Sequence, residues 1–547
     1  VGIQPATGQR VGLVLSGGGA KGLSHIGVIE VLEENGIPID YIAGTSIGAI
    51  VGAMYAIGYT PEQMRELVTS ERFLRWSRGE IKEEDKFYFQ QSPPNSSWID
   101  LELARDSIWR AYLPTNLIPS HQMDFAFMEI LAQANALSQS NFDSLFVPFR
   151  CVASDIYQSR PVVFRKGDLA KAVRASMTYP FYYRPIKVDS VLLMDGGIYN
   201  NFPADVMKTE FQPEIMIGSK VATNSKPPDE DDLLSQLENI FTRKTRFDLP
   251  ADTSFLIEPE TRDIGLMEFR KAEEIIENGA TAARECVNEI ASVVNRSIDP
   301  NELDRRRQNY IRRQPPLLFG NVFIHGVDDQ KKEYFESSFY TQSKDTLTLE
   351  EVREKYLKLA VNDNVSAIFP TAVYNPQTGL FDLHLQVEAR NRVTVSVGGN
   401  ISLNSVNQAF MQGEYSYLGR ESVSFRANTY FGRLYSSAQL MGKFETPGKF
   451  PLALDGGFTF NRWDYFKGSN ELYFEDIRPS YIIRNEMNFK VDLSFPLNTT
   501  GKGEFGAAVA SMRDKYYQSN HFMQSDTADI TEFNLHTYHF TYELNTL

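Results

Sequence analysis

Residues 44–48 read Gly-Thr-Ser-Ile-Gly, which places a serine at the centre of a G-x-S-x-G pattern. A short apolar segment precedes the pattern, and a helical pattern rich in glycine and alanine follows over residues 47–57. This order predicts a tight strand–turn–helix elbow that projects the hydroxyl of Ser46 into open space. Gly44 and Gly48 prevent clashes between strand and helix, and the positive helix end faces an incoming oxyanion. The pattern therefore favours Ser46 as a nucleophile.

A glycine-rich loop, residues 16–22, follows the first apolar segment of the chain and opens a helical pattern. It reads Ser-Gly-Gly-Gly-Ala-Lys-Gly, so several backbone N–H groups can converge on one point beside a helix N-terminus. Such a loop predicts an anion cradle. In a serine esterase this cradle would be the oxyanion hole, where the loss of one donor costs roughly 3 kcal/mol.

The same loop has a second interpretation as a nucleotide site. Gly17, Gly19 and Gly22 fit the G-x-G-x-x-G pattern of dinucleotide-binding folds, and Asp40 lies near the distance expected of a ribose-binding acid. That acid belongs at the carboxyl end of the second strand, whereas Asp40 precedes the apolar segment 41–43. This interpretation is therefore the weaker of the two. A P-loop is excluded because Gly22 is followed by leucine.

A nucleophilic serine needs a base, and an aspartate is the better candidate in this region. Asp195 ends an apolar segment and is followed by Gly196 and Gly197, which suits a carboxylate held close to another backbone. Burial would raise its pKa and its basicity. An Asp-Gly pair that only caps a turn is the alternative. His25 falls within the first helical pattern and His121 in a loop with no carboxylate evident beside it, so neither is favoured.

Together, the glycine loop with Lys21, the G-T-S-I-G elbow and the D-G-G triplet resemble patatin-like phospholipases in content and order. The resemblance covers residues 10–295 and includes the segment 174–180, Arg-Ala-Ser-Met-Thr-Tyr-Pro. It implies a lipid acyl hydrolase without metal or cofactor, which acts on membrane phospholipids or other acyl esters through an acyl-enzyme. It implies Ser46 as nucleophile and Asp195 as base. The implied oxyanion donors are Gly17, Gly18 and Gly19, and the supporting motif residues are Lys21, Gly22, Gly44, Gly48, Gly196 and Gly197.

Length and composition restrict the remaining possibilities. With 547 residues the chain is too long for one core, so about two to four domains are expected. The formal net charge of -15 disfavours general nucleic-acid binding, which needs concentrated lysine and arginine. Cys151 and Cys286 could pair or stay reduced, and they mark neither a disulfide scaffold nor a zinc site. No apolar run reaches the ~18 to 20 residues of a membrane-spanning helix.

Regions with different periodicities divide the chain. Residues 1–295 alternate apolar strands with helical patterns, which predicts an α/β domain with a mostly parallel central sheet and helices on both faces. Residues 296–317 are polar and basic, end near a Pro-Pro pair and are expected to be a linker. Residues 318–390 read as strand, two helices and a hairpin, a small α+β unit that resembles a POTRA domain. Thr348 and Glu351 have the spacing of a capping box ahead of its second helix.

Residues 391–547 alternate apolar and polar residues in about eight segments, each near the length of a tilted membrane strand. We interpret them as an antiparallel transmembrane β-barrel, which could be incomplete because no clear final strand with a terminal aromatic residue is evident. A soluble sandwich with one wet face is the alternative. Aromatic residues near the segment ends favour the barrel, since membrane barrels carry aromatic girdles. They are Tyr415, Tyr417, Tyr430, Phe431, Phe458, Phe460 and Trp463.

The order of esterase, POTRA-like unit and barrel resembles patatin-like proteins of the bacterial outer membrane. The resemblance implies an outer-membrane location, with lipid around the barrel. A barrel of about eight strands is filled by side chains and leaves no room for this chain to cross, so we expect a periplasmic esterase domain. A cell-surface or secreted domain stays open, and an incomplete barrel is compatible with a homodimer. The main functional alternative is an outer-membrane transport or assembly protein whose first domain is non-catalytic or is itself exported.

Overall fold

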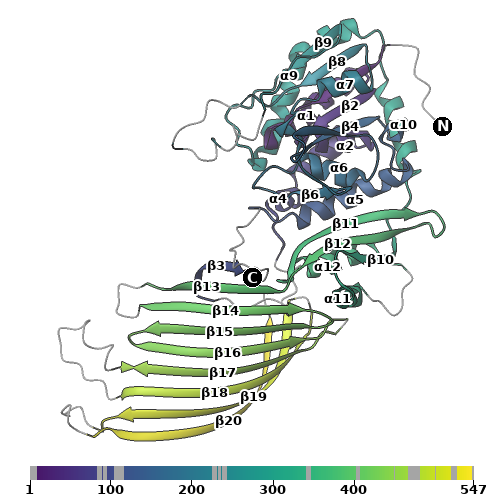
Figure 1. Cartoon of the computed structure of the whole chain (residues 1–547). Coiled ribbons are helices and arrows are strands. Elements are labelled where there is room, and N and C mark those ends of the chain that lie inside the picture. The colour runs from purple at the N-terminus through teal and green to yellow at the C-terminus, as the bar shows by residue number, and fades with distance from the viewer. Residues whose placement is uncertain are drawn as a thin grey trace.

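The computed structural model divides the chain into three units (Figure 1). An α/β unit comes first, a small α+β module follows, and a broad antiparallel sheet comes last. The described residues are 9–82, 89, 95–103, 116–224, 231, 236, 243–339, 346–401, 407–448, 450–465, 481–498, 500–518 and 527–544.

The α/β unit is built on a mixed eight-stranded sheet. Its strands are β1 (Val11–Leu15), β2 (Tyr41–Thr45), β4 (Phe149–Asp155), β5 (Arg160–Phe164), β6 (Ile186–Val188), β7 (Val191–Asp195), β8 (Ile215–Ser219) and β9 (Thr253–Ile257). The strand order is β6-β7-β4-β2-β1-β8-β9, and β5 also pairs with β4. The strands from β4 to β9 along this order are parallel, whereas β5, β6 and β7 pair antiparallel. The predicted parallel centre is confirmed, with an antiparallel edge added.

Helices cover both faces of this sheet (Figure 1). They are α1 (Ser24–Glu34), α2 (Ile47–Ala56), α3 (Pro61–Thr69), α4 (Glu71–Arg78), α5 (His121–Leu137), α6 (Leu169–Ser176), α7 (Ala204–Glu210) and α9 (Ala272–Val293). Side chains alternate along β1, so Leu13 and Leu15 join the larger core, whereas Val14 packs with Met207 of α7 on the opposite face. Among the described helices, none is long and apolar enough to cross a membrane.

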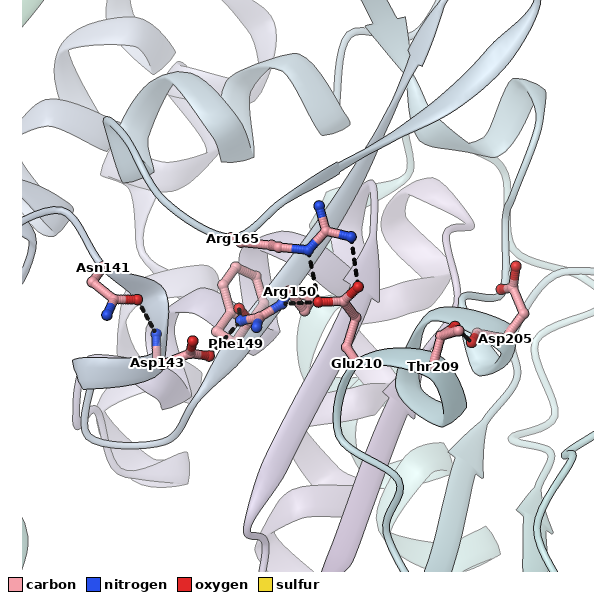
Figure 2. A network of polar contacts seen from close by, with 8 residues as sticks. All are labelled: Asn141, Asp143, Phe149, Arg150, Arg165, Asp205, Thr209 and Glu210. Atoms are coloured by element: carbon pink, nitrogen blue, oxygen red, sulfur yellow. Dashed lines mark hydrogen bonds and ion pairs between the residues drawn. The ribbon is translucent and has the colours of Figure 1, made fainter. Parts of the chain in front are cut away.

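A polar network fixes the amino end of β4 (Figure 2). The buried Arg150 guanidinium donates to Asp143 over 2.7 Å and to Glu210, the last residue of α7, over 3.1 Å. Arg165 donates to the same Glu210 carboxylate over 2.7 Å. Arg165, and then Arg150, lower the pKa of Glu210 to about 2. The end of α7 is therefore tied to the sheet by charge.

The segment expected to be a linker contains a helix that packs on the α/β unit. This helix, α10 (Pro300–Ile311), begins after Asp299, whose side chain caps it. Arg307 on α10 is buried and donates to Glu33 of α1. Tyr310 packs against Phe146 of the α/β unit. Packed structure therefore continues past the predicted boundary at residue 295.

The small module follows the strand–helix–helix–strand–strand order that its sequence predicts. Its elements are β10 (Phe319–His325), α11 (Asp329–Phe339), α12 (Leu349–Ala360), β11 (Val365–Asn375) and β12 (Leu380–Ala389). The sheet order is β10-β12-β11, with β10 parallel to β12. Thr348 and Glu351 form the predicted capping box at the start of α12.

Helix α5 belongs to two hydrophobic cores at once. Its residues Met123 and Phe127 pack into the core of the α/β unit, and Phe125 and Met128 pack into the core of the small module. The Tyr356 hydroxyl of α12 also donates to the backbone carbonyl at the start of α5. The two units therefore share a helix rather than meeting through a flexible tether.

The last unit is one antiparallel sheet of nine strands. Its strands are β13 (Arg392–Asn400), β14 (Gln408–Leu418), β15 (Ser422–Gly432), β16 (Tyr435–Glu445), β17 (Ala453–Asp464), β18 (Tyr481–Pro496), β19 (Gly501–Tyr516), β20 (Asp529–Leu544) and β3 (Ser97–Leu103). The eight expected strands are present in sequence order, and β3 from the first unit pairs with β13 (Figure 1). Within the described residues, β3 and β20 are two open edges, so the predicted barrel is not closed.

This sheet has one polar and one apolar face. Along β18, Lys490, Asp492 and Ser494 alternate with Phe489 and Val491. The predicted aromatic girdle is only partly right. Tyr415, Tyr417, Phe431, Phe458 and Phe460 fall on the apolar face by register, whereas Tyr430 and Trp463 fall on the polar face. Both of the latter rings pack against Tyr435.

Candidate active site

Ser46 lies at the turn between β2 and α2, as its sequence context predicts. Its backbone angles are φ 55° and ψ -124°, a conformation that side-chain-bearing residues rarely adopt and that the surroundings must hold. Gly44 and Gly48 make room for the turn. A Cβ on Gly44 would lie 2.3 Å from the Gly48 carbonyl oxygen, and one on Gly48 would lie 2.5 Å from that of Leu15. Because Ser46 precedes α2, the positive end of that helix lies at the serine.

The fold brings Asp195 into contact with Ser46. The Ser46 hydroxyl donates to Asp195 Oδ2 over 2.6 Å, and the Gly197 N–H donates to Oδ1 over 2.7 Å. Asp195 ends β7, and its own N–H donates to the Thr178 carbonyl over 2.9 Å. Only 3% of Asp195 is exposed. Within the described part of the chain, no cation pairs with this carboxylate, so its surroundings differ from those of an ordinary ion pair.

Burial determines the acid–base character of Asp195. It raises the pKa of this carboxyl to about 6, although the hydrogen bonds from Ser46 and Gly197 act in the opposite direction. Above that pH the carboxylate is ionised and can accept the proton of the serine hydroxyl. The pair therefore has the geometry and the pKa that a nucleophile and its base require.

The segment 174–178 holds both members of the pair. The Ser176 hydroxyl accepts the Ser46 N–H over 2.9 Å and donates to the Val152 carbonyl over 2.6 Å. The Thr178 carbonyl holds the backbone of Asp195. The sequence indicated this segment only through the family resemblance, since a buried hydroxyl that orients a neighbouring backbone has no local pattern of its own.

Arg174 anchors this segment to α5. Its buried guanidinium donates to Asp124 of α5 over 2.5 Å, to the Thr178 hydroxyl over 2.5 Å and to the Arg184 carbonyl over 3.1 Å. Both charged side chains of the Arg174–Asp124 pair are at most 5% exposed. A chain of contacts therefore runs from α5 through Arg174 and Thr178 to Asp195.

The glycine loop adjoins the serine. A Cβ on Gly17 would lie 3.1 Å from the Cβ of Ser46. The Gly17 N–H donates to the carbonyl of Asn201 over 3.0 Å, so this predicted oxyanion donor is already engaged. Gly18 and Gly19 have φ of 158° and 58°. Both angles are positive, which suits glycine at this turn.

The other glycines of the motifs provide close packing. A Cβ on Gly22 would lie 2.0 Å from the Ile47 side chain, and one on Gly196 would lie 2.1 Å from the Val152 carbonyl oxygen. Lys21 lies on the short helical turn Gly19–Leu23 beside them and is partly exposed. These residues support the elbow and the loop rather than the reacting atoms.

The two histidines of the α/β unit are engaged elsewhere. His25 is buried in α1, where its ring contacts the Ser219 hydroxyl at 2.7 Å and the Ser16 carbonyl at 2.9 Å. Burial lowers the pKa of His25 to about 4. His121 begins α5 instead of lying in the predicted loop, and burial lowers its pKa as well. In the described structure the Ser46 hydroxyl donates to Asp195 and to neither histidine.

The geometry around Asp40 contradicts the dinucleotide interpretation. Asp40 precedes β2, accepts the Val11 N–H over 2.8 Å and pairs with Arg296. It therefore lies at the amino end of the sheet, whereas the glycine loop follows the carboxyl end of β1. The open question of the cysteines is also settled, because Cys151 and Cys286 are both free thiols.

Comparison with known proteins relates the α/β unit to one family. Residues 13–208 match the patatin-like phospholipase family. A patatin-like phospholipase domain-containing protein of Caenorhabditis elegans is 28% identical over 57% of this chain and 23% of its own length. Human patatin-like phospholipase domain-containing protein 6 is 33% identical over 42% of this chain and 14% of its own. A lysophospholipase of Saccharomyces cerevisiae is 26% identical over 61% of this chain and 18% of its own. The chain thus spans less than a quarter of these relatives.

Solved structures resemble the chain more weakly. BamA from Haemophilus ducreyi lacking POTRA domains 1-3 aligns with 13% identity over 42% of this chain and 44% of its own, with a TM-score of 0.33. The type III effector protein ExoU aligns with 14% identity over 56% of this chain and 62% of its own, with a TM-score of 0.24. Scores this low carry no conclusion about the fold or the function.

Proposed function

We propose that the protein is a lipid acyl hydrolase with Ser46 as nucleophile and Asp195 as base, since residues 13–208 match the patatin-like phospholipase family. The observation that carries this proposal is the 2.6 Å hydrogen bond from the Ser46 hydroxyl to the Asp195 carboxylate. The two residues are 149 positions apart in the chain and meet at a strained elbow. Packing alone does not require such a contact, whereas a serine hydrolase does.

The first half of the reaction acylates the serine. Asp195 Oδ2 takes the hydroxyl proton while Ser46 Oγ attacks the carbonyl carbon of a phospholipid or another acyl ester. The resulting oxyanion accepts hydrogen bonds from the N–H groups of Gly18 and Gly19, at the positive end of the neighbouring helices. Gly17 instead holds the loop through Asn201. Collapse of the tetrahedral intermediate expels the alcohol, which takes the proton from Asp195, and leaves an acyl group on Ser46.

Water completes the cycle. Asp195, again ionised, accepts a proton from water as the water oxygen attacks the acyl carbon, and a second tetrahedral intermediate forms at the same N–H groups. Its collapse returns the proton to Ser46 Oγ and releases a fatty acid. One carboxylate serves both halves, which is consistent with a site where no second base contacts Ser46 within the described structure.

A small apolar cavity of about 20 Å³ lies close to the proposed nucleophile along the chain. It lies against α2, the helix that starts directly after Ser46, and Ile50 lies one turn into that helix. The cavity is too small to hold an acyl chain as it stands, and its lining shows only that the surroundings of α2 are apolar. Its walls include Ile50, Met54, Leu67, Phe73, Trp76, Met123, Phe127, Leu131 and Val173.

The C-terminal sheet supports attachment to a membrane. Leu440, Phe458, Phe489 and Val509 form a row of cross-strand partners on β16 to β19. Each of these side chains is at least 42% exposed. A contiguous exposed apolar face beside a polar one suits a sheet with lipid on one side. We therefore extend the proposal to an outer-membrane protein in which this sheet contributes to a barrel and the small module is a POTRA-like domain.

The strand connections support a periplasmic hydrolase. At the end of the sheet where β13 leaves the small module, the connections are short, at residues 419–421, 446–452 and 497–500. At the opposite end, residues 401–407, 433–434, 465–480 and 517–528 separate successive strands, so three of these four connections are as long as or longer than those at the module end and one is short. Outer-membrane barrels have short periplasmic turns and longer extracellular loops. This asymmetry supports the proposal that the module, and the hydrolase packed on it, lie on the periplasmic side.

The test of the hydrolase is labelling with a fluorescent alkyl phosphonate, which traps activated serines. The full chain in detergent is compared with Ser46→Ala, Asp195→Asn and, as a matched control, Ser154→Ala. The buried Ser154 hydroxyl has no hydrogen-bond partner in the described structure, so its loss leaves the site intact. We expect the probe to label the unmodified protein and Ser154→Ala but neither of the other two variants. In a separate assay without the probe, the same two proteins should release fatty acid from phospholipid vesicles.

The other outcomes discriminate between the alternatives. Labelling that survives Ser46→Ala would identify a different nucleophile. A folded, unmodified protein that neither labels nor hydrolyses lipid would favour the transport or assembly function, with the first domain as a non-catalytic module.

A further inference from the structure

Three ligand-type side chains meet on the polar face of the C-terminal sheet. Asp492 of β18, Gly506 of β19 and His539 of β20 are cross-strand partners in one row, so their positions share a face. Glu504 lies two residues before Gly506 and therefore shares that face. One carboxylate oxygen each of Asp492 and Glu504 and one ring nitrogen of His539 lie within 4.8 Å of one another.

The separations suit a shared ion better than direct hydrogen bonds. His539 Nε2 lies 3.4 Å from Asp492 Oδ1 and 3.6 Å from Glu504 Oε1. Nitrogen and oxygen ligands lie about 2.0 to 2.2 Å from zinc, so two ligands of one tetrahedral ion are about 3.3 to 3.6 Å apart. The His539 nitrogen is therefore spaced from each carboxylate oxygen as two ligands of one ion are, and the two oxygens lie within 4.8 Å of each other.

Each carboxylate has one oxygen oriented by the protein and the other turned to this centre. Lys490 Nζ pairs with Asp492 Oδ2 at 2.8 Å, and the Ser494 hydroxyl donates to Glu504 Oε2 over 3.2 Å. The Asp492 side chain is 1% exposed, and its Oδ1 has no hydrogen-bond partner among the described residues. A buried carboxylate oxygen without a partner costs free energy, and a bound cation removes that cost.

Gly506 provides the space for this cluster. A Cβ at this position would lie 2.1 Å from Asp492 Oδ1 and 2.4 Å from His539 Nε2. Any other residue would displace the two ligand groups from each other. Gly506 does not have a positive φ, so a need for the wider backbone freedom of glycine does not explain why a glycine stands at this position.

We propose that Asp492, Glu504 and His539 bind one divalent transition-metal ion. An imidazole nitrogen with two carboxylate oxygens matches zinc best, because zinc accepts nitrogen and oxygen ligands in a tetrahedral arrangement. Lys490 and Ser494 act as outer partners that orient the carboxylates. The ion joins β18, β19 and β20, and it has no part in the hydrolysis at Ser46, so the site stands or falls independently of the proposed function.

The test uses cobalt(II), whose visible absorption reports tetrahedral binding, on the metal-free full chain in detergent without a histidine tag. We expect one saturable equivalent of Co²⁺ that Zn²⁺ displaces. Gly506→Ala removes no ligand but should abolish binding, because its Cβ occupies the space between Asp492 and His539. Gly456→Ala is the matched control, since a Cβ at that glycine of β17 meets nothing within 4 Å.

A second pair of variants separates binding from folding. His539→Cys keeps a ligand, so it should add a thiolate-to-cobalt charge-transfer absorption, a positive signal that loss of folding cannot imitate. His536 lies on the opposite face of β20 from His539. His536→Ala should therefore bind cobalt as the unmodified chain does. His325 and His384 form a second pair of imidazoles, with ring nitrogens 2.9 Å apart, that could bind cobalt instead. His384→Ala removes one of them and should leave the measured binding unchanged. Absence of saturable binding, binding undiminished in Gly506→Ala, or His539→Cys without the new absorption would overturn the proposal.

Discussion

Two carboxylates of the α/β unit, Asp195 and Glu210, lie toward opposite ends of the same sheet and have opposite acid–base character. Asp195 lies beside the carboxyl end of β4, where burial raises its pKa to about 6. Glu210 contacts Arg150 at the amino end of β4, where Arg165 and Arg150 lower its pKa to about 2 (Figure 2). Both side chains are largely buried.

The difference in pKa between the two carboxyl groups comes from their hydrogen-bond partners rather than from how deeply they are buried. Glu210 receives hydrogen bonds from two guanidinium groups, which stabilise its charge and make it a poor proton acceptor. Asp195 receives one hydroxyl and one backbone N–H, so its charge is only partly compensated. A carboxylate kept away from cations is costly for folding but basic enough for chemistry. If the proposed function holds, one end of the sheet therefore serves stability and the other serves reactivity.

The largest expected effect is that of Asp195→Asn on hydrolysis. Loss of the base should lower kcat for phospholipid hydrolysis by about 10³ to 10⁴, as loss of a positioned proton acceptor does in other hydrolases. Stability should change in the other direction. Since the folded pKa is raised, the ionised carboxylate destabilises the fold by up to ~3 kcal/mol above pH 6, a cost that is absent below the ordinary pKa.

Turnover and thermal unfolding of Asp195→Asn at pH 8 check this prediction together. An unfolding temperature equal to or above that of the unmodified protein, with activity lost, separates a catalytic role from a structural one. A variant that unfolds earlier and keeps its turnover per folded molecule would contradict the assignment of Asp195 as base.

The next effect concerns Arg174, which connects the reactive end of the sheet to α5. Arg174→Met leaves Asp124 buried without its cation, so we expect a loss of about 3 to 5 kcal/mol in the free energy of unfolding. Arg174 contacts no reacting atom and acts as a positioning residue through Thr178. The folded fraction should therefore show a lower kcat with little change in KM. Denaturant unfolding and steady-state kinetics of the same preparation measure both.

A double variant provides the control for this charge pair. Arg174→Met combined with Asp124→Leu removes both charges and should recover much of the lost stability, because an apolar pair can replace a buried ion pair. Recovery of stability without recovery of kcat would support positioning through the Thr178 contacts. Full recovery of both would show that Arg174 matters only for folding.

Local patterns predict the turn at Ser46 and the strand end at Asp195, which the structure brings into contact, whereas they do not predict contacts between distant segments. The elbow at Ser46 and the acid at Asp195 each follow from a few neighbouring residues, because a tight turn and a strand end have strong local requirements. The engagement of the Gly17 N–H by Asn201 depends on a contact between distant segments. The pairing of β3 with β13 likewise joins residues about three hundred positions apart, and no periodicity records such a partner.

The same reasoning explains the errors in the C-terminal sheet. Period-two alternation predicted eight strands because it reports which residues share a face. Closure of a barrel depends on which edges meet, and alternation does not contain that information. Their position near strand ends predicts a lipid-facing girdle that includes Tyr430 and Trp463, but register places both on the polar face. Distance along a strand and facing direction are independent properties.

A smaller effect is the pH dependence of hydrolysis. Because Asp195 must be ionised to accept the Ser46 proton, kcat/KM should fall about tenfold per pH unit below about pH 6 and level off above it. Initial rates with a soluble acyl ester between about pH 3 and pH 8 measure the inflection. Glu210→Gln is the matched control, since removal of the distant carboxylate should leave the inflection unchanged. An inflection near the ordinary aspartate pKa of 3.8 would contradict the raised pKa.

The smallest effect is that of Glu210→Gln on stability, and it tests the other half of the comparison. Its folded pKa is lowered from 4.5 to about 2, so its stabilising contribution is complete above pH 4.5 and is lost as the pH falls towards 2. One side of the network meets solvent, and screening should limit this contribution to about 2 kcal/mol. Denaturant unfolding should thus show a deficit for Glu210→Gln at pH 7 that shrinks at pH 3, with kcat unchanged at pH 7. A deficit of equal size at both pH values would mean that shape and hydrogen bonding, rather than charge, hold this end of the sheet.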